Sequence, residues 1–210
     1  QALADFVIGH HYPECREEKN PYAAFLQQVV TRTAKLIAHW QSVGFAHGVM
    51  NTDNMSILGE TFDYGPFGFL DEYNPHFICN HSDHTGRYAF AQQPSVGLWN
   101  CNALAHALSP LVPVEYLHEI LSSYQPAIEK HYLQLMRGKL GLETVQGDDA
   151  ALLGQLLDLM HKNHIDYTIF FRMLCDFSTS TNNPSLRDLF ADRDAFDQWQ
   201  HQYKARLAAE

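Results

Sequence analysis

The sequence predicts a mainly helical fold (α+β) in which a small β-rich region interrupts the helices. Three observations support this prediction. Apolar residues recur at helical spacing in a long stretch after Asn20-Pro21. Glycine, asparagine, aspartate and aromatic residues crowd together between residues 46 and 91, a composition typical of turns and short strands. Helical patterns then return after Gln93-Pro94.

Two helices are expected in the first part of the chain. The opening residues from Gln1 have the pattern of an amphipathic helix. Asn20 is a favoured N-cap residue and Pro21 suits the first helical position, so a second helix is expected to begin there. Its broad apolar stripe predicts a long helix that faces the core and ends near Gly44. The stripe consists of Phe25, Leu26, Val29, Val30, Leu36, Ile37 and Trp40.

The middle of the chain is expected to hold short strands separated by turns. The apolar residues 55–58 and the pair Thr61-Phe62 are each long enough for one brief strand. Loop-rich stretches between long helices often carry functional side chains. We therefore expect the functional groups in this region.

The remainder of the chain is expected to be helical, with Pro126 kinking or splitting the longest helix. The expected helices cover residues 96–108, 114–140, 150–161, 167–177 and 195–207. The chain then divides into leading helices (1–45), a loop region that carries the site (46–93) and a helical remainder (94–210).

Composition excludes several classes of protein. The chain has 210 residues and a formal charge of −10, which disfavours a nucleic-acid binder because such proteins usually present a basic face. No apolar run approaches the roughly 20 residues that cross a bilayer, so no membrane partner is expected. Four cysteines in a chain of this length do not form a disulfide scaffold and favour a reducing compartment.

The most informative motif lies between His47 and Asn54 and is followed by Asp63-Tyr64-Gly65. In a protein-kinase catalytic loop, His is followed two positions later by the catalytic Asp and five positions after that by Asn, and an Asp-Phe-Gly turn comes later. His47 and Asn54 occupy the first and last of these positions, whereas Val49 stands at the catalytic Asp.

The chemistry of phosphoryl or nucleotidyl transfer suits these residues. Transfer from ATP needs hard oxygen ligands for Mg²⁺ and a group that orients the attacking hydroxyl. Asn54 and Asp63 supply two such oxygens, and Asp53 can accept a proton where Val49 cannot. Each of these residues alone is typical of an ordinary turn, where Asp and Asn bind local backbone groups. Their ordered combination after a long helix favours a site instead.

These motifs, together with residues 66–69 and 81–88, strongly resemble the selenoprotein O (YdiU) family over most of the chain. The resemblance implies a protein-kinase-like C-terminal lobe that acts as a protein adenylyltransferase. Such an enzyme binds ATP in a flipped orientation and transfers AMP to Ser, Thr or Tyr hydroxyls of protein substrates. By this resemblance, Asn54 and Asp63 would hold Mg²⁺ or Mn²⁺ and Asp53 would be the catalytic base. Bacterial members are cytoplasmic and eukaryotic members mitochondrial.

The resemblance also implies that some of the family's functional residues are missing from this chain. The Lys, its Glu partner and the arginines that hold the nucleotide lie upstream of Leu3 in the family, and the redox-active C-terminal residue lies beyond Glu210. Gln92 stands where the family pattern tends to have Asn. We therefore expect a fragment that lacks the N-terminal lobe and is inactive by itself.

Three other interpretations remain open. Val49 is compatible with a non-catalytic pseudokinase scaffold that only binds partners. A conventional protein kinase is disfavoured, because it would need an acid at that position. A zinc-binding domain that uses Cys79, His81 and His84 is the third, although their spacing matches no standard zinc motif.

Overall fold

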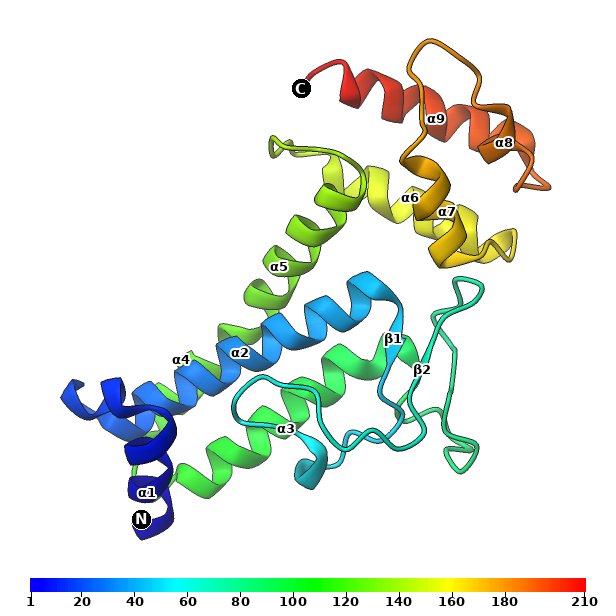
Figure 1. Ribbon diagram of the computed structural model, residues 1–210. Coiled ribbons are helices and arrows are strands. Elements are labelled where there is room, and N and C mark those ends of the chain that lie inside the picture. The colour runs from blue at the N-terminus through cyan, green and yellow to red at the C-terminus, as the bar shows by residue number, and fades with distance from the viewer.

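The computed structural model describes residues 1–210 and is mainly helical, as predicted. Figure 1 shows two groups of helices, with the strands beside the first group. The first group comprises α1 (Ala2–His11), α2 (Pro21–Val43), α3 (Gln93–Leu108), α4 (Val114–Ser122) and α5 (Tyr124–Lys139). The second group comprises α6 (Asp149–Lys162), α7 (Tyr167–Leu174), α8 (Pro184–Arg187) and α9 (Arg193–Leu207).

Helix α2 begins and ends where the sequence predicts. The Asn20 side chain accepts hydrogen bonds from the backbone N–H groups of Tyr22 and Ala23 at its N-terminus. At its C-terminus, Gly44 adopts a left-handed conformation (φ 70°), and its N–H donates to the carbonyl of Trp40. The helix is therefore fixed at both ends, and the chain leaves it in a defined direction toward the site.

The strands lie elsewhere than predicted. Residues 55–58 and Thr61-Phe62 form turns and irregular backbone, so that prediction is wrong. The two strands are instead β1 (Phe45–Ala46) and β2 (Gly68–Phe69), which pair antiparallel. The apolar side chains of Met55, Ile57 and Leu58 pack against the helical core and are partly buried there, although their backbone pairs with no strand.

The predicted long helix over residues 114–140 is split, as expected, but at Ser123 rather than at Pro126. Pro126 lies in the first turn of α5, where its missing N–H needs no partner within the helix. The short helix α8 was not predicted, because four residues carry too little periodicity to be recognised.

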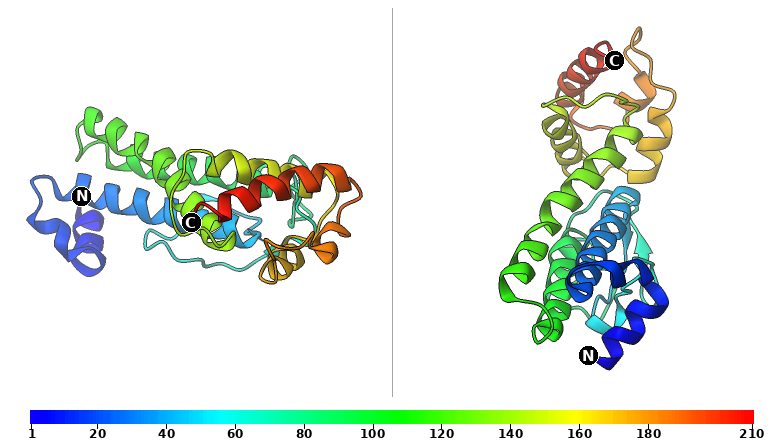
Figure 2. Two further views of the ribbon diagram at one scale, coloured as in Figure 1. Left: turned by 90° about the horizontal axis from the view of Figure 1, so that it is seen from above. Right: turned by 90° about the vertical axis from the view of Figure 1, so that its left-hand side faces the viewer.

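The molecule has two hydrophobic cores. One lies among α2–α5 and includes Trp40 and Phe45, and the other lies among α6–α9 and includes Ala46, Phe170 and Trp199. Helix α5 packs along α2, extends from the first group of helices toward the second and contributes to both cores (Figures 1 and 2). Strand β1 therefore lies where the two cores meet. No helix is both long and apolar enough to cross a membrane.

Candidate functional site

The strand pair brings the two predicted site segments together. Phe45 pairs with Phe69 and Ala46 with Gly68, so the residue before His47 is tied to the chain that follows the Asp63 turn. The N–H of Leu70 extends this pairing by donating to the carbonyl of Gly44 at 2.8 Å. The loop from His47 to Asn54 and the turn at Asp63 consequently leave the same small sheet.

A buried histidine joins the two segments directly. His47 is 1% exposed, and its Nε2 lies 2.9 Å from the carbonyl oxygen of Phe62. Because a carbonyl can only accept, Nε2 must carry the proton, and Nδ1 is then left buried without a protein partner. Trp40 adds a second connection, since its Nε1 donates to Thr61 Oγ1 at 2.8 Å. The backbone next to Asp63 is thus held from two directions.

Gly48 is required by both its conformation and its surroundings. Its φ of 82° lies in the left-handed region that glycine favours. A Cβ atom at this position would lie 2.7 Å from Cys79 Sγ and 3.1 Å from the carbonyl oxygen of Pro66. The chain can therefore turn closely past residues 66 and 79 only with glycine after His47.

The three predicted site residues lie on the surface of these segments. Asp53 and Asn54 belong to the short 3-10 helix Thr52–Asn54, and both Asp53 and Asp63 are exposed. Asn54 is half-buried, and its Nδ2 donates to the carbonyl of Val49 at 3.3 Å. The Oδ1 atom of the same amide is not used in this hydrogen bond and is available to a ligand. Asp63 has a φ of 57°, a left-handed conformation that aspartate tolerates better than most residues.

Helix α3 supports the site loop through two buried amides that the sequence analysis missed. Gln93 is fully buried; its Oε1 accepts from the N–H of His47 and its Nε2 donates to the carbonyl of Phe45, both at 2.9 Å. Asn100 Nδ2 donates to the carbonyl of Met50, also at 2.9 Å. Gln93 and Asn100 are seven residues apart and share one helix face, which is the signal that could have identified them.

The segment 80–88 also supports the loop 47–54, through contacts separate from those of α3. Asn80 Nδ2 donates to the carbonyl of Gly48 at 3.2 Å, and Tyr88 donates its hydroxyl proton to Asn51 Oδ1. Asp83 accepts from the N–H groups of Arg87 and Tyr88. Desolvation opposes ionisation of Asp83, but these N–H donors outweigh it and lower its pKa. Asp83 thus fixes the turn that presents Tyr88.

The structure does not form the zinc site considered for Cys79, His81 and His84. No group of three or more His, Cys, Asp or Glu side chains is placed to hold a metal ion. Cys79 instead directs its thiol at the carbonyl of Ala46, with a sulfur–oxygen distance of 3.5 Å. All four cysteines are free.

The oxygen atoms of Asn54 and Asp63 fit a different kind of metal. Mg²⁺ and Mn²⁺ prefer oxygen ligands, and Mg²⁺ at phosphate-transfer sites commonly takes only one or two protein ligands, with water and substrate phosphates completing its shell. An amide oxygen and an exposed carboxylate are suitable donors for this arrangement. Two protein ligands are compatible with the absence of any three-residue cluster.

Comparisons with known proteins identify the family. A family model described as protein adenylyltransferase SelO matches residues 1–210. The chain is 55% identical over 208 residues to a protein nucleotidyltransferase YdiU from Aliivibrio salmonicida, covering 99% of this chain and 43% of that protein. Proteins of the same name from Pseudomonas fluorescens and Salmonella paratyphi B are each 54% identical, with 98% and 100% of this chain and 42% and 44% of the relatives covered. The chain thus spans less than half the length of these curated relatives, and it belongs to the SelO family.

Proposed function

We propose that this chain is part of a protein adenylyltransferase that transfers AMP from ATP to the hydroxyl groups of Ser, Thr or Tyr in proteins. The family assignment supports nucleotidyl transfer. The observation that carries the proposal is the His47–Phe62 contact, because it connects the loop that bears Asp53 and Asn54 to the turn that bears Asp63. The order of helix, loop and turn also supports a fold like the large lobe of a protein kinase for α2–α5.

In the proposed reaction, a substrate hydroxyl oxygen forms a bond to the α-phosphorus of ATP, and the bond from that phosphorus to the bridging oxygen breaks. Pyrophosphate leaves, and Asp53 takes the hydroxyl proton. Asn54 Oδ1 and the Asp63 carboxylate would hold Mg²⁺ or Mn²⁺, which would neutralise charge on the phosphates. The exposure of both aspartates leaves them accessible to substrate.

The rigid support of the loop has a clear role in this scheme. Catalysis of transfer to a hydroxyl depends mainly on positioning and on fixed charge near the phosphates. Gln93 and Asn100 bind the loop backbone at residues 47 and 50, and Tyr88 binds the side chain of Asn51. These positioning residues keep Asp53 and Asn54 in a constant orientation.

The experiment uses the full-length protein, because the relatives are more than twice as long as this chain. The protein is incubated with a protein substrate and with ATP labelled at either the α- or the γ-phosphate. We expect the α-label alone to be transferred, and we expect chelation with EDTA to abolish the transfer. Transfer of the γ-label would indicate a kinase, and no transfer of either label would indicate a binding scaffold.

Variants then test the residue assignments. Asp63→Ala is expected to abolish transfer of the α-label, and Asp53→Ala to reduce it by at least 100-fold. Asp71→Ala is the matched control, since Asp71 is an exposed aspartate eight residues after Asp63, beyond β2. Full activity of Asp63→Ala would exclude the proposed metal ligand.

A further inference from the structure

The strand pair β1–β2 has two ends, and the candidate site lies at only one of them. The chain leaves β1 at His47 and enters β2 from Phe67 at the site end. At the opposite end, it enters β1 from Gly44 and leaves β2 at Leu70. Each strand has two residues, and so short a pair is not rigid by itself. The placement of the two strands therefore depends on what supports each end.

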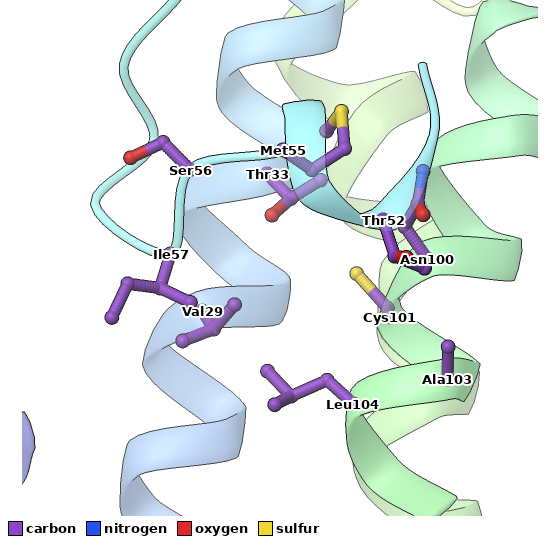
Figure 3. A pocket seen from close by; sticks show the side chains of 10 residues that line it. All are labelled: Val29, Thr33, Thr52, Met55, Ser56, Ile57, Asn100, Cys101, Ala103 and Leu104. Atoms are coloured by element: carbon purple, nitrogen blue, oxygen red, sulfur yellow. The ribbon is translucent and has the colours of Figure 1, made fainter. Parts of the chain in front are cut away.

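Helix α3 supports the strand pair on the side of the site. Figure 3 shows Asn100, on α3, pointing toward the 3-10 helix that begins at Thr52. Gln93, on the same helix, binds the backbone of both Phe45 and His47. The opposite end is supported by the second group of helices instead.

Tyr167, the first residue of α7, contacts both segments at the opposite end of the strand pair. Its hydroxyl donates to the carbonyl of Ser42 at 3.0 Å, two residues before Gly44. Its backbone N–H donates to the carbonyl of Asp71 at 2.7 Å, directly after Leu70. One buried residue thus holds the segment that enters β1 and the segment that leaves β2.

The groups that meet here are ones that helices leave free. The carbonyl of Ser42 lies in the last turn of α2 and the N–H of Tyr167 in the first turn of α7, where helices provide no internal partner. The Asp166 side chain accepts from the N–H of Ile169 and fixes the start of α7 at Tyr167. Burial raises the pKa of the Tyr167 hydroxyl, which therefore stays protonated and donates. The contact follows from where α2 ends and α7 begins.

The ring of Tyr167 packs closely against the same segments. It stacks on the ring of Tyr73 with a centroid distance of 5.8 Å. A Cβ atom at Gly44 would lie 3.2 Å from its Cδ1. The N–H of Tyr73 donates to the carbonyl of Ile165 at 2.8 Å, which adds a second backbone connection beside the start of α7. The segment that leaves β2 is thus tied to the second group of helices by backbone and side-chain contacts.

We propose that Tyr167 is a positioning residue for the site: it sets the placement of β1 relative to β2, and through the strands the separation of Asn54 and Asp63. This inference rests on the proposed function, because it concerns the two proposed metal ligands. A misplacement of about 1 Å at a reacting centre can cost about 100-fold in rate, even when its cause lies elsewhere in the protein. The second group of helices thereby influences the reaction, although Tyr167 touches no reacting atom.

The variant Tyr167→Phe removes the hydroxyl and keeps the ring. The carbonyl of Ser42 keeps a donor in this variant, because Lys139 Nζ binds it at 2.6 Å, so the variant is expected to fold. In the full-length protein we expect kcat for α-label transfer to fall about tenfold, with KM for ATP unchanged within about twofold. The Mg²⁺ concentration that gives half-maximal activity is expected to rise about tenfold, since the two ligands are less well placed.

The variant Tyr203→Phe is the matched control. Tyr203 is another buried tyrosine of the second group, and its hydroxyl donates to the carbonyl of Leu140 at 2.6 Å. This variant is expected to lower the urea midpoint at least as much as Tyr167→Phe, because Leu140 loses its side-chain donor whereas Ser42 keeps Lys139. It is expected to leave kcat and the Mg²⁺ dependence unchanged. Equal falls of kcat in the two variants, or none in Tyr167→Phe, would overturn the proposal.

Hydrogen exchange of the same full-length proteins provides a measurement that does not require activity. Mass spectrometry follows residues 45–54 and 61–70. Exchange in both segments is expected to be faster in Tyr167→Phe and unchanged in Tyr203→Phe, because only the first variant loosens the strand pair. If the unmodified protein transfers no label, the proposed function fails, and the exchange measurement still decides whether Tyr167 holds the strands. Unchanged exchange in both segments of Tyr167→Phe would overturn the proposal.

Discussion

The Nε2 atom of His47 lies 2.9 Å from the carbonyl oxygen of Phe62, and this contact joins the two segments that carry the proposed metal ligands. The His47 side chain is buried, and its ring centroid lies 5.4 Å from that of Trp40. The loop that bears Asn54 and the turn that bears Asp63 are therefore connected through the imidazole of His47.

Replacing His47 with Leu is expected to lower the free energy of unfolding by about 1–3 kcal/mol, because the carbonyl of Phe62 loses its buried donor. The measurement is urea denaturation followed by circular dichroism. His118→Leu is the control, since His118 is exposed on α4 and its replacement is expected to change stability by less than about 0.5 kcal/mol. Equal effects of the two substitutions would show that the His47 contact contributes nothing specific.

Tyr88→Phe is expected to lower kcat for the proposed transfer by about tenfold while leaving KM for ATP nearly unchanged, because it frees Asn51 at the start of the 3-10 helix. Steady-state kinetics of the full-length protein measure both constants. Tyr116→Phe, at an exposed tyrosine on α4, serves as the control. A change in KM alone would place Tyr88 in nucleotide binding and not in positioning.

Replacing glycine with alanine at positions 44 and 138 is expected to change the free energy of unfolding in opposite directions. Gly44→Ala should lower the free energy of unfolding by at least about 1 kcal/mol, because φ is 70° and the new Cβ would lie 3.2 Å from the ring of Tyr167. Gly138→Ala should raise it by about 0.5–1 kcal/mol, since Gly138 is helical and its Cβ would meet nothing within 4 Å. Thermal and urea unfolding test both. Destabilisation by Gly138→Ala would contradict this account of α5.

Lys139 gives the protein a predictable dependence on alkaline pH. Burial lowers the pKa of its ammonium group from 10.5 to about 8, even though Nζ donates to the carbonyl of Ser42 at 2.6 Å and lies over the rings of Tyr167 and Phe171. Between these two pKa values the unfolded chain holds a proton that the folded chain has released. The contribution of Lys139 to the free energy of unfolding therefore rises as the pH increases from about 8 to 10.5.

The variant Lys139→Met isolates this effect from other groups that titrate in the same range. The free energy of unfolding of the unmodified protein, minus that of the variant, is expected to be constant below about pH 8 and to increase at higher pH. Denaturation at pH 7, 8, 9 and 10 measures the difference. A decrease with rising pH would show that Ser42 and the two rings stabilise the charged form more strongly than burial destabilises it.

Local signals in the sequence were sufficient for the ends of α2 and for the approximate positions of the other long helices. Asn20 and Gly44 mark the ends of α2 because caps depend on neighbouring backbone groups alone. The strands were not predictable in this way, since β1 and β2 have two residues each and exist only through pairing with each other. Residues 55–58 have a composition suited to a strand, but their apolar side chains are partly buried by packing against the helical core instead.

The site shows the same difference between residues recognisable from a local pattern and residues that depend on long-range contacts. Asp53, Asn54 and Asp63 could be selected from the sequence because they lie within one recognisable motif, and their roles stay predictions. The residues that support them could not be selected so directly. Gln93 and Asn100 bind the loop from 46 and 50 positions away. Their spacing on α3 shows that they share a helix face, but which groups that face contacts follows from how α3 packs on α2.

The position of β1 between the two hydrophobic cores limits how this protein can evolve. Phe45 belongs to the core among α2–α5 and the next residue, Ala46, to the core among α6–α9, and His47 follows at once. A substitution that repacks either core therefore moves the backbone from which the site loop departs. Selection on activity would then restrict buried positions as distant as those of α9, and the two cores would have to accumulate compensating substitutions together.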